Sequence, residues 1–166
     1  SIATNDYQRD YLLPSFFQNV RSDAPGMTFG VIPTYYSDLA MLREDRCQLM
    51  IVPQPPSATD IVQRRLLTDR YICYYDAECR EAPATVEDYL SAQHVVIMLS
   101  GYNRLPVDKM IDDMGLKRDV FLSLPNFAGA LEFIRGTNLI ATLPSLMSET
   151  SNLGVANCPP PFDLPD

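Results

Sequence analysis

The sequence contains a single histidine, His94, and its four cysteines form no C-x-x-C pair. Metal sites built from Cys and His need clusters of these residues, so the sequence predicts no metal ion and no other cofactor. Cys47 and Cys73 lie in apolar, strand-like runs and are interpreted as buried reduced thiols. A single disulfide stays open as an alternative, whereas a secreted disulfide framework is not indicated.

Long apolar runs and catalytic motifs are also missing. No run reaches the roughly 18 apolar residues needed to span a membrane, and the opening residues do not resemble a signal peptide. The sequence lacks G-x-G-x-x-G, G-x-x-x-x-G-K-[ST], G-x-S-x-G and H-E-x-x-H. His94 is interpreted as a structural or surface residue and not as a general base, and Asp112 and Asp113 as a solvated helix face. No catalytic residue is therefore predicted, and an enzyme is the least favoured class of function.

Positive charge is scarce: the formal net charge is −8. This charge argues against a nucleic-acid backbone as the direct partner of this chain. The hydrophobic fraction of 46% and the charged fraction of 20% are those of an ordinary globular protein. A length of 166 residues allows one sizeable core or two small ones.

The first half of the chain alternates predicted strands and helices. Residues 1–6, "SIATND", have the pattern of a short buried strand, and Asp6 is predicted to cap a helix over residues 7–22. Pro14 is expected to delay or bend the start of that helix. "MTFGVIPTYY" is the next predicted strand, with Ser37 as the following helix cap. The apolar run "CQLMIVP" favours a strand covered on both faces.

The second half repeats this alternation. The extended segment "RRLLTDRYICYYDA" precedes the polar residues 76–83, after which Thr85 and Asp88 are predicted to cap a short helix. "HVVIML" and "DVFLSLP" are predicted strands, and between them a helix is expected from Pro106 to Gly115. An amphipathic helix is predicted next, with one apolar face formed by Phe127, Ala130, Leu131 and Ile134. The pattern predicts two α/β units, each with a partly parallel sheet.

Small polar residues stand where the apolar strands stop, in "ATND", "PTYYS", "VPQ", "LSGYN", "LPN" and "ATLPS". In open α/β sheets, ligands bind outside the carboxyl ends of the strands. The alternative is that these residues only cap helices, and one residue can do both. Arg104 is a candidate for a carboxylate or nitro group, or else a surface arginine. Tyr35-Tyr36 and Tyr74-Tyr75 line a pocket for a flat ligand or pack in the core.

These segments together resemble the effector-binding half of a LysR-type transcriptional regulator. The resemblance is carried by "ATNDYQRDYLLPSFFQNVRSDAPGMTFGV", "LAMLREDRCQLMIVP", "RRLLTDRYICYYDA" and "LSLPNFAGALEFIRGTNLIATLPSLM". It implies two Rossmann-like subdomains with mixed, mostly parallel sheets, similar to type 2 periplasmic solute-binding proteins. Subdomain I would comprise residues 1–76 and 157–166, and subdomain II residues 77–156. Two crossover strands, near residues 75–77 and 157–160, would join them.

The resemblance also implies a small-molecule inducer between the subdomains, with some similarity to members that sense aromatic acids or nitroaromatics. By position, the implied ligand-binding residues are Asn5, Asp6, Tyr7, Thr34, Tyr35, Pro53, Tyr102, Asn103, Arg104, Asn126, Phe127 and Thr142.

The winged helix-turn-helix of the family is absent from this chain, so DNA would be contacted only through that domain. The closing strand and helix of subdomain I are also expected to be missing after Asp166, and the strand edge this leaves could pair with another copy. A cytoplasmic homodimer or homotetramer without membrane contact is expected. The alternatives are the solute-binding protein of a transporter and, less favoured, a small enzyme on the same scaffold.

Overall fold

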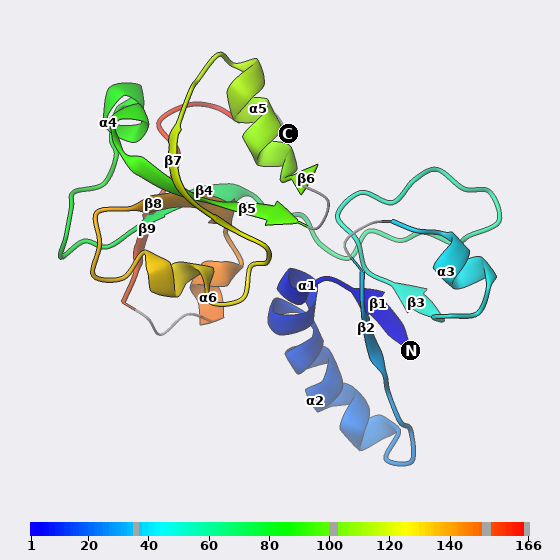
Figure 1. The fold of residues 1–166 in the computed structure, drawn as a ribbon. Coiled ribbons are helices and arrows are strands. Elements are labelled where there is room, and N and C mark those ends of the chain that lie inside the picture. Colours follow the sequence, from blue (N-terminus) through cyan, green and yellow to red (C-terminus); the bar gives the residue numbers. More distant parts are fainter. Residues whose placement is uncertain (35–36, 100–102, 151–153, 165–166) are drawn as a thin grey trace. The chain divides into compact units, whose positions relative to one another are not determined.

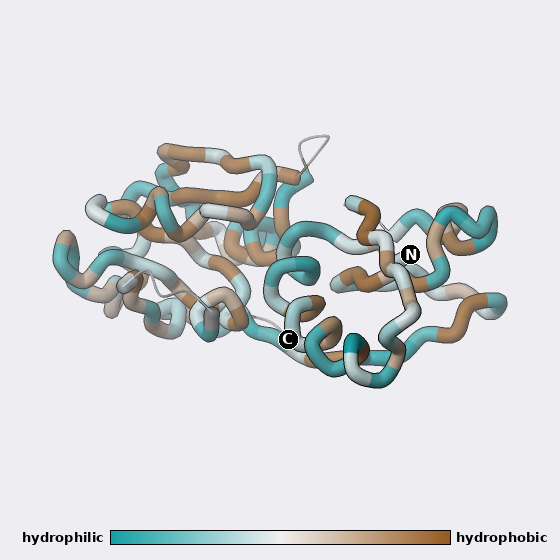
Figure 2. Tube along the Cα trace, turned by 90° about the horizontal axis from the view of Figure 1, so that it is seen from below, coloured by the Kyte–Doolittle hydropathy of each residue, from teal (hydrophilic) through white to brown (hydrophobic). Residues whose placement is uncertain are grey.

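The chain folds into two compact α/β units in the computed structural model, which describes residues 1–34, 37–99, 103–150 and 154–164 (Figure 1). Unit 1 comprises Ser1–Leu67 and unit 2 comprises Thr68–Asp166. The predicted α/β class is thereby confirmed. Residues 68–76 and 157–164 belong to unit 2 by their contacts, whereas the resemblance assigns them to subdomain I. The predicted subdomain division stays a prediction. Apolar stretches alternate with polar connections along the chain (Figure 2).

Unit 1 is built on a three-stranded parallel sheet in the order β2-β1-β3, with β1 at its centre. Ile2 of β1 pairs with Val31 of β2 and Leu49 of β3. The carboxyl ends of these strands therefore meet at one edge. The elements of unit 1 are β1 (Ile2–Thr4), α1 (Asp6–Tyr11), α2 (Leu13–Asp23), β2 (Val31–Pro33), α3 (Ala40–Arg43) and β3 (Leu49–Met50).

The single helix predicted over residues 7–22 is divided into α1 and α2 at Leu12. Pro14 has no backbone N–H and its ring crowds the preceding turn, which explains the division. The predicted cap was also wrong by one residue, because Asn5 caps α1: its side-chain oxygen accepts a hydrogen bond from the Gln8 backbone N–H at 3.2 Å. Asp6 instead is the first residue of α1.

The core of unit 1 is small. Ala3, Met41 and Cys47 are buried together, and partly buried residues of β2, α3 and β3 pack against them. The prediction that "CQLMIVP" is a strand covered on both faces was wrong, because β3 holds only two residues and Leu49 is 57% exposed. A strand at the edge of a three-stranded sheet lacks a neighbour on one side.

Unit 2 contains a six-stranded mixed sheet in the order β6-β5-β8-β4-β9, with β7 paired to β5. Strand β5 runs parallel to β7 and β8, whereas β4 is antiparallel to β8 and β9. The elements of unit 2 are β4 (Tyr71–Tyr75), α4 (Val86–Ser91), β5 (Gln93–Leu99), β6 (Asn103–Arg104), α5 (Pro106–Asp113), β7 (Asp119–Leu124), the 3₁₀ helix η1 (Ala130–Phe133), β8 (Ile140–Pro144), α6 (Met147–Thr150) and β9 (Ala156–Cys158).

Local sequence signals account for two helices of unit 2. Thr85 and Asp88 form the predicted capping box of α4: the Thr85 hydroxyl accepts from the Asp88 N–H at 3.1 Å, and the Asp88 carboxylate accepts from the Thr85 N–H at 3.0 Å. Helix α5 begins at Pro106, and Gly115 follows it with φ of 75°. This positive φ suits glycine at a helix end.

The predicted amphipathic helix after residue 126 is only the short 3₁₀ helix η1. Gly129 and Gly136 adopt φ of 73° and 72°, outside the α-helical range, and so interrupt a longer helix. The residues of the predicted apolar face are nevertheless buried: Phe127, Ala130, Leu131 and Ile134. None of the helices in the described ranges combines the length and the apolarity needed to cross a bilayer.

Candidate functional site

The carboxyl edge of the unit 1 sheet brings several predicted site residues together. Thr34 follows β2, and its backbone N–H donates to the Thr4 carbonyl oxygen at 2.9 Å. Asn5 and Asp6 continue directly from β1 into α1. Asn5, Asp6 and Thr34 are each 8% exposed. Parallel pairing of β1 and β2 therefore collects three of the predicted residues at one edge, as the sequence pattern implied.

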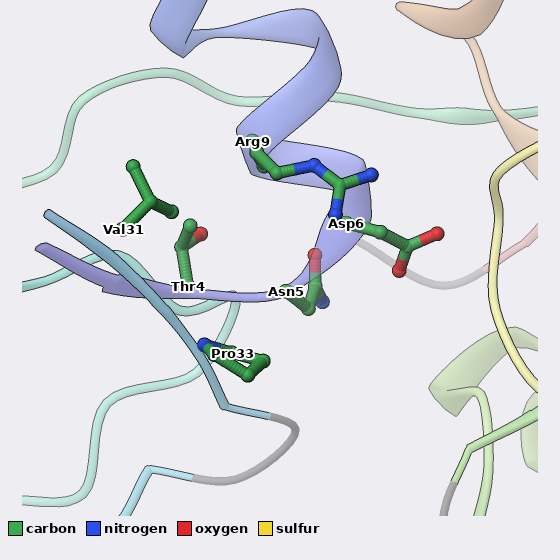
Figure 3. Close-up of a pocket in the computed structure, with 6 residues that line it drawn as sticks. All are labelled: Thr4, Asn5, Asp6, Arg9, Val31 and Pro33. Carbon is green, nitrogen blue, oxygen red and sulfur yellow. The ribbon is translucent and has the colours of Figure 1, made fainter.

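A hollow of about 160 Å³ opens at this edge. Figure 3 shows its lining, which comes from the end of β1, from β2 and from the first turns of α1. The residues that line it are Thr4, Asn5, Asp6, Arg9, Val31 and Pro33. The wall is thus mixed, with two apolar side chains of β2 facing hydroxyl, amide, carboxylate and guanidinium groups.

Thr4 contributes a buried hydroxyl to this hollow. Its side chain is buried, with the residue 1% exposed, and its Oγ1 has no hydrogen-bond partner among the described residues. Gln8 Oε1, in α1, is likewise buried with no partner in the described part of the chain. A buried hydroxyl without a partner costs about 1–3 kcal/mol. Native structures satisfy most such groups, so an unsatisfied one calls for an explanation.

Two further polar groups of the hollow, those of Asn5 and Arg9, already have local roles. The Asn5 side-chain oxygen caps α1. Arg9 donates two hydrogen bonds to the Asp10 carboxylate, at 2.6 and 2.8 Å. The positive charge of Arg9 is therefore balanced by its neighbour. A ligand that filled the hollow would lie among the buried Thr4 hydroxyl, the Asp6 carboxylate and the Arg9 guanidinium.

The remaining predicted residues of unit 1 are placed differently. Tyr7 is buried, and its ring lies 5.4 Å from that of Tyr11, centroid to centroid. Pro53 follows β3 by three residues and is exposed. Tyr35 lies outside the described residues, as does Tyr36. Their contribution to the site stays a prediction.

In unit 2, predicted residues gather near the carboxyl ends of parallel strands β5 and β7. Ile97 of β5 pairs with Leu124, the last residue of β7. Asn126 and Phe127 follow shortly after; Phe127 is buried and Asn126 half-buried. Tyr102 lies outside the described residues.

Arg104 and Asn103 form the short strand β6 and are exposed. Arg104 forms an ion pair with Asp112, whose side chain is 44% exposed. The hydrogen bond to that carboxylate raises the pKa of Arg104 above its ordinary value. A ligand carboxylate or nitro group at Arg104 would have to replace Asp112. The predicted role of Arg104 in binding stays a prediction.

Thr142 lies within β8 and not beyond its end, because β8 continues through Leu143 and Pro144, which pair with β4. The Thr142 hydroxyl and the Tyr89 hydroxyl form a buried hydrogen bond of 2.6 Å. Burial raises the pKa of Tyr89 to about 12, so the phenol stays neutral. Tyr74 is fully buried, and its hydroxyl donates to the Pro144 carbonyl at 2.8 Å, which favours the core-packing alternative for this tyrosine.

His94 is a core residue. It is fully buried, its ring packs edge-on against Tyr89 at 4.6 Å, and its Nε2 donates to the Tyr89 carbonyl at 2.9 Å. Burial lowers the pKa of His94 to about 4. The predicted structural role of His94 agrees with these contacts. Within the described ranges, no group of three or more His, Cys, Asp or Glu side chains could hold a metal ion.

Thr4, Arg9, Val31 and Pro33 line the hollow but are not among the residues predicted from the sequence. The signal for Thr4 was present in "ATND", where it immediately precedes Asn5. Arg9 was less accessible to prediction, because only the short first helix α1 places it one turn above the strand end. Val31 and Pro33 line the hollow because β2 pairs in parallel with β1.

Comparison with known proteins places this arrangement in a family. A family model described as the LysR substrate binding domain matches residues 1–165. The HTH-type transcriptional activator NahR of Pseudomonas putida is 26% identical over 171 residues, which cover 100% of this chain and 57% of NahR. The chain thus spans little more than half of the length of this curated relative.

Solved structures show the same fold. A probable transcriptional regulator from Pseudomonas aeruginosa superposes with a TM-score of 0.83 at 23% identity, covering 99% of this chain and 57% of that protein. The regulatory domain of MexT, a transcriptional activator in Pseudomonas aeruginosa, gives 0.75 at 24% identity, covering 98% of this chain and 83% of that domain. The chain belongs to the LysR substrate binding domain family.

Proposed function

We propose that this chain is the effector-binding regulatory domain of a LysR-type transcriptional regulator, and that the hollow at Thr4 binds the polar end of its small-molecule inducer. The observation that carries the proposal is the Thr4 hydroxyl, which is buried, lines the hollow and lacks a partner among the described residues. A ligand oxygen there would satisfy this hydroxyl. Its desolvation cost would then be offset only in the bound state.

The size and lining of the hollow indicate that it would hold either one part of a larger ligand or a whole small ligand. Pockets that enclose drug-sized molecules measure roughly 300–1,000 Å³, whereas this hollow measures about 160 Å³. A carboxylate or nitro group would accept hydrogen bonds from the Thr4 hydroxyl and from the Arg9 guanidinium. At Arg9 it would compete with Asp10 and lie near the Asp6 carboxylate. An aromatic ring is the proposed remainder of the ligand, as the similarity to family members that sense aromatic acids or nitroaromatics implies.

Further contacts are proposed from the residues implied by the family resemblance. These include Asn5, Asp6, Thr34, Asn126 and Phe127. For a ligand of about 10–15 heavy atoms, a yield of about 0.3–0.5 kcal/mol per atom gives dissociation constants from millimolar to roughly 10 µM. Such an affinity suits a metabolite sensor that follows a changing concentration.

The regulatory step is proposed to be a coupling between inducer binding and DNA binding elsewhere in the full-length protein. A winged helix-turn-helix preceding this chain would contact DNA, in a dimer or tetramer located in the cytoplasm. A coupling free energy of about 1–3 kcal/mol would change DNA affinity about 5- to 150-fold. The net charge of −8 supports assigning DNA contact to another domain.

The test is calorimetric titration of this chain with a panel of aromatic carboxylates and nitroaromatics, together with aliphatic carboxylates. Thr4→Val removes the hydroxyl while keeping the shape of the side chain. Thr28→Val, at an exposed threonine of the same unit, is the matched control. We expect Thr4→Val to weaken binding about tenfold, corresponding to ~1.4 kcal/mol, and Thr28→Val to leave it unchanged.

Two outcomes would contradict the proposal. Unchanged affinity in Thr4→Val would place the ligand elsewhere, and no heat or thermal shift with any compound class would argue against a sensor of such metabolites. Asn126→Ala in the same titration tests the proposed participation of unit 2. An unchanged dissociation constant in that variant would restrict the site to unit 1.

A further inference from the structure

Cys73 and Cys158 lie directly opposite each other on neighbouring strands. Cys73 is in β4 and Cys158 in β9, and the antiparallel register pairs their Cα atoms. Opposed residues of an antiparallel pair project from the same face, with Cα atoms about 4.5 or 5.5 Å apart. Disulfides occur at Cα separations of about 4.4–6.8 Å. The backbone geometry therefore permits a bond between these two cysteines with little movement.

The two side chains also face each other. All four cysteines are free thiols, and a hydrogen bond joins the side chains of Cys73 and Cys158. This hydrogen bond lowers the pKa of Cys158 below its ordinary value, with the positive charge of Arg80 acting in the same direction. The same bond and burial raise the pKa of Cys73. Cys158 is thus the sulfur that more readily becomes a thiolate, which is the reactive form.

The solvent accessibility of the two cysteines indicates the same division of roles between Cys158 and Cys73. Cys158 is half-buried on β9, the last strand of the sheet order, so a small oxidant can reach it. Cys73 is fully buried on β4 and is shielded from direct attack. The pairing of an accessible thiolate with a protected neighbouring thiol is the arrangement of an attacking cysteine and a resolving cysteine.

We propose that Cys73 and Cys158 form an oxidation site, a cross-strand dithiol that closes to a disulfide on exposure to a peroxide. The Cys158 thiolate attacks one peroxide oxygen, the O–O bond breaks and hydroxide leaves, so that Cys158 carries an S–OH group. The Cys73 sulfur then attacks the Cys158 sulfur, and the S–OH oxygen leaves as water with the Cys73 proton. In sum, two thiols lose two hydrogen atoms and one hydrogen peroxide becomes two waters.

The consequence is a covalent link between strand β9 and strand β4. Without it, β9 is held through its pairing with β4, since β4 is its neighbour in the sheet. The bond would restrict local opening of this edge. Both cysteines belong to unit 2, so the reaction does not depend on the proposed ligand site in unit 1.

The experiment treats the reduced, purified chain with hydrogen peroxide, counts the free thiols and maps the disulfide by mass spectrometry of peptides. We expect loss of two of the four thiols, a Cys73–Cys158 linked peptide, no covalent dimer and full reversal by dithiothreitol. Cys158→Ser should abolish the link and slow oxidation of Cys73 at least tenfold. Cys79→Ser, which removes an exposed cysteine outside the pair, should leave the link unchanged.

Three results would overturn the proposal. The first is oxidation confined to Cys79, without a Cys73–Cys158 peptide. The second is oxidation of Cys158 that stops at S–OH or higher acids while Cys73 stays reduced. The third is equal oxidation of Cys73 in the wild type and in Cys158→Ser. The peptide map of the wild-type chain decides the first two even when a variant fails to fold.

Discussion

Replacing Asp108 by Asn is expected to destabilise unit 2 strongly. Asp108 lies in helix α5 and forms an ion pair with Arg118 at 2.5 Å. The two side chains are only 3% and 2% exposed. The other Asp108 carboxylate oxygen accepts a hydrogen bond from the Leu105 backbone N–H at 3.2 Å. The substitution keeps the size of the side chain but leaves the Arg118 guanidinium buried without a counter-charge.

The magnitude follows from this burial. Removing one partner of a buried ion pair typically costs 3–5 kcal/mol, because the remaining charge is left uncompensated. Small domains have a free energy of unfolding of roughly 5–15 kcal/mol, so the expected loss is a large fraction of the total. The exposed pair between Arg104 and Asp112 offers a control on the same helix. Exposed pairs contribute about 0–1 kcal/mol.

Urea unfolding followed by circular dichroism measures both variants. For Asp108→Asn, a loss of 3 kcal/mol at an m-value of up to about 3 kcal/mol per molar lowers the midpoint by at least about 1 M. For Asp112→Asn, the midpoint should move by much less. Similar shifts in the two variants would refute the reasoning, because burial would then not determine the cost of losing the carboxylate.

Two further predictions concern the core of unit 2. The free energy of unfolding should fall by up to about 3 kcal/mol as the pH is lowered from 6.5 to 4, because the unfolded chain protonates its histidine in this range while buried His94, with a pKa of about 4, stays neutral. Urea unfolding at several pH values should show a shallower dependence in His94→Gln, and identical dependences would contradict this assignment. Tyr89→Phe removes the 2.6 Å hydrogen bond to Thr142 and should cost about 1–3 kcal/mol, since the Thr142 hydroxyl is left buried. Adding Thr142→Val should recover part of that loss in a thermal-unfolding double-mutant cycle, whereas additive losses would exclude a direct interaction.

The sequence predicted helices correctly where residues close to a helix end determine where that helix begins. The Thr85 and Asp88 capping box and the start of α5 at Pro106 were both predicted, since each depends on residues within one turn. The prediction of one continuous helix over residues 7–22 was wrong, because Pro14 divides it at Leu12. The helix after residue 126 was shorter than predicted because Gly129 takes a positive φ.

The candidate site was predictable in position but not in detail. The "ATND" motif indicated a polar strand end, and the parallel register brought Thr34 to the same edge. Whether the Thr4 hydroxyl finds a partner among the described residues depends on how α1 and β2 pack around it. No sequence pattern predicts this packing. Thr142 shows the opposite case: a residue predicted at a strand end lies within a strand, engaged with Tyr89 from a distant helix.

The pairing of Cys73 with Cys158 could not be predicted from their spacing in the sequence. Cys73 and Cys158 are separated by most of unit 2, and only the pairing of β4 with β9 places them opposite each other. The predicted burial of Cys73 is confirmed, since the residue is fully buried. Its partner became evident only from the antiparallel register.

The most direct measurement of the central claim is the pair of effects of Thr4→Val on stability and on ligand binding. The variant replaces a buried hydroxyl that has no partner in the described part of the chain with a methyl group. The ligand-free chain should therefore be as stable as the wild type or more stable, by up to about 1–3 kcal/mol. The same variant should bind the best aromatic carboxylate about tenfold more weakly. A less stable variant with unchanged affinity would contradict the account, because the hydroxyl would then serve the fold and not a ligand.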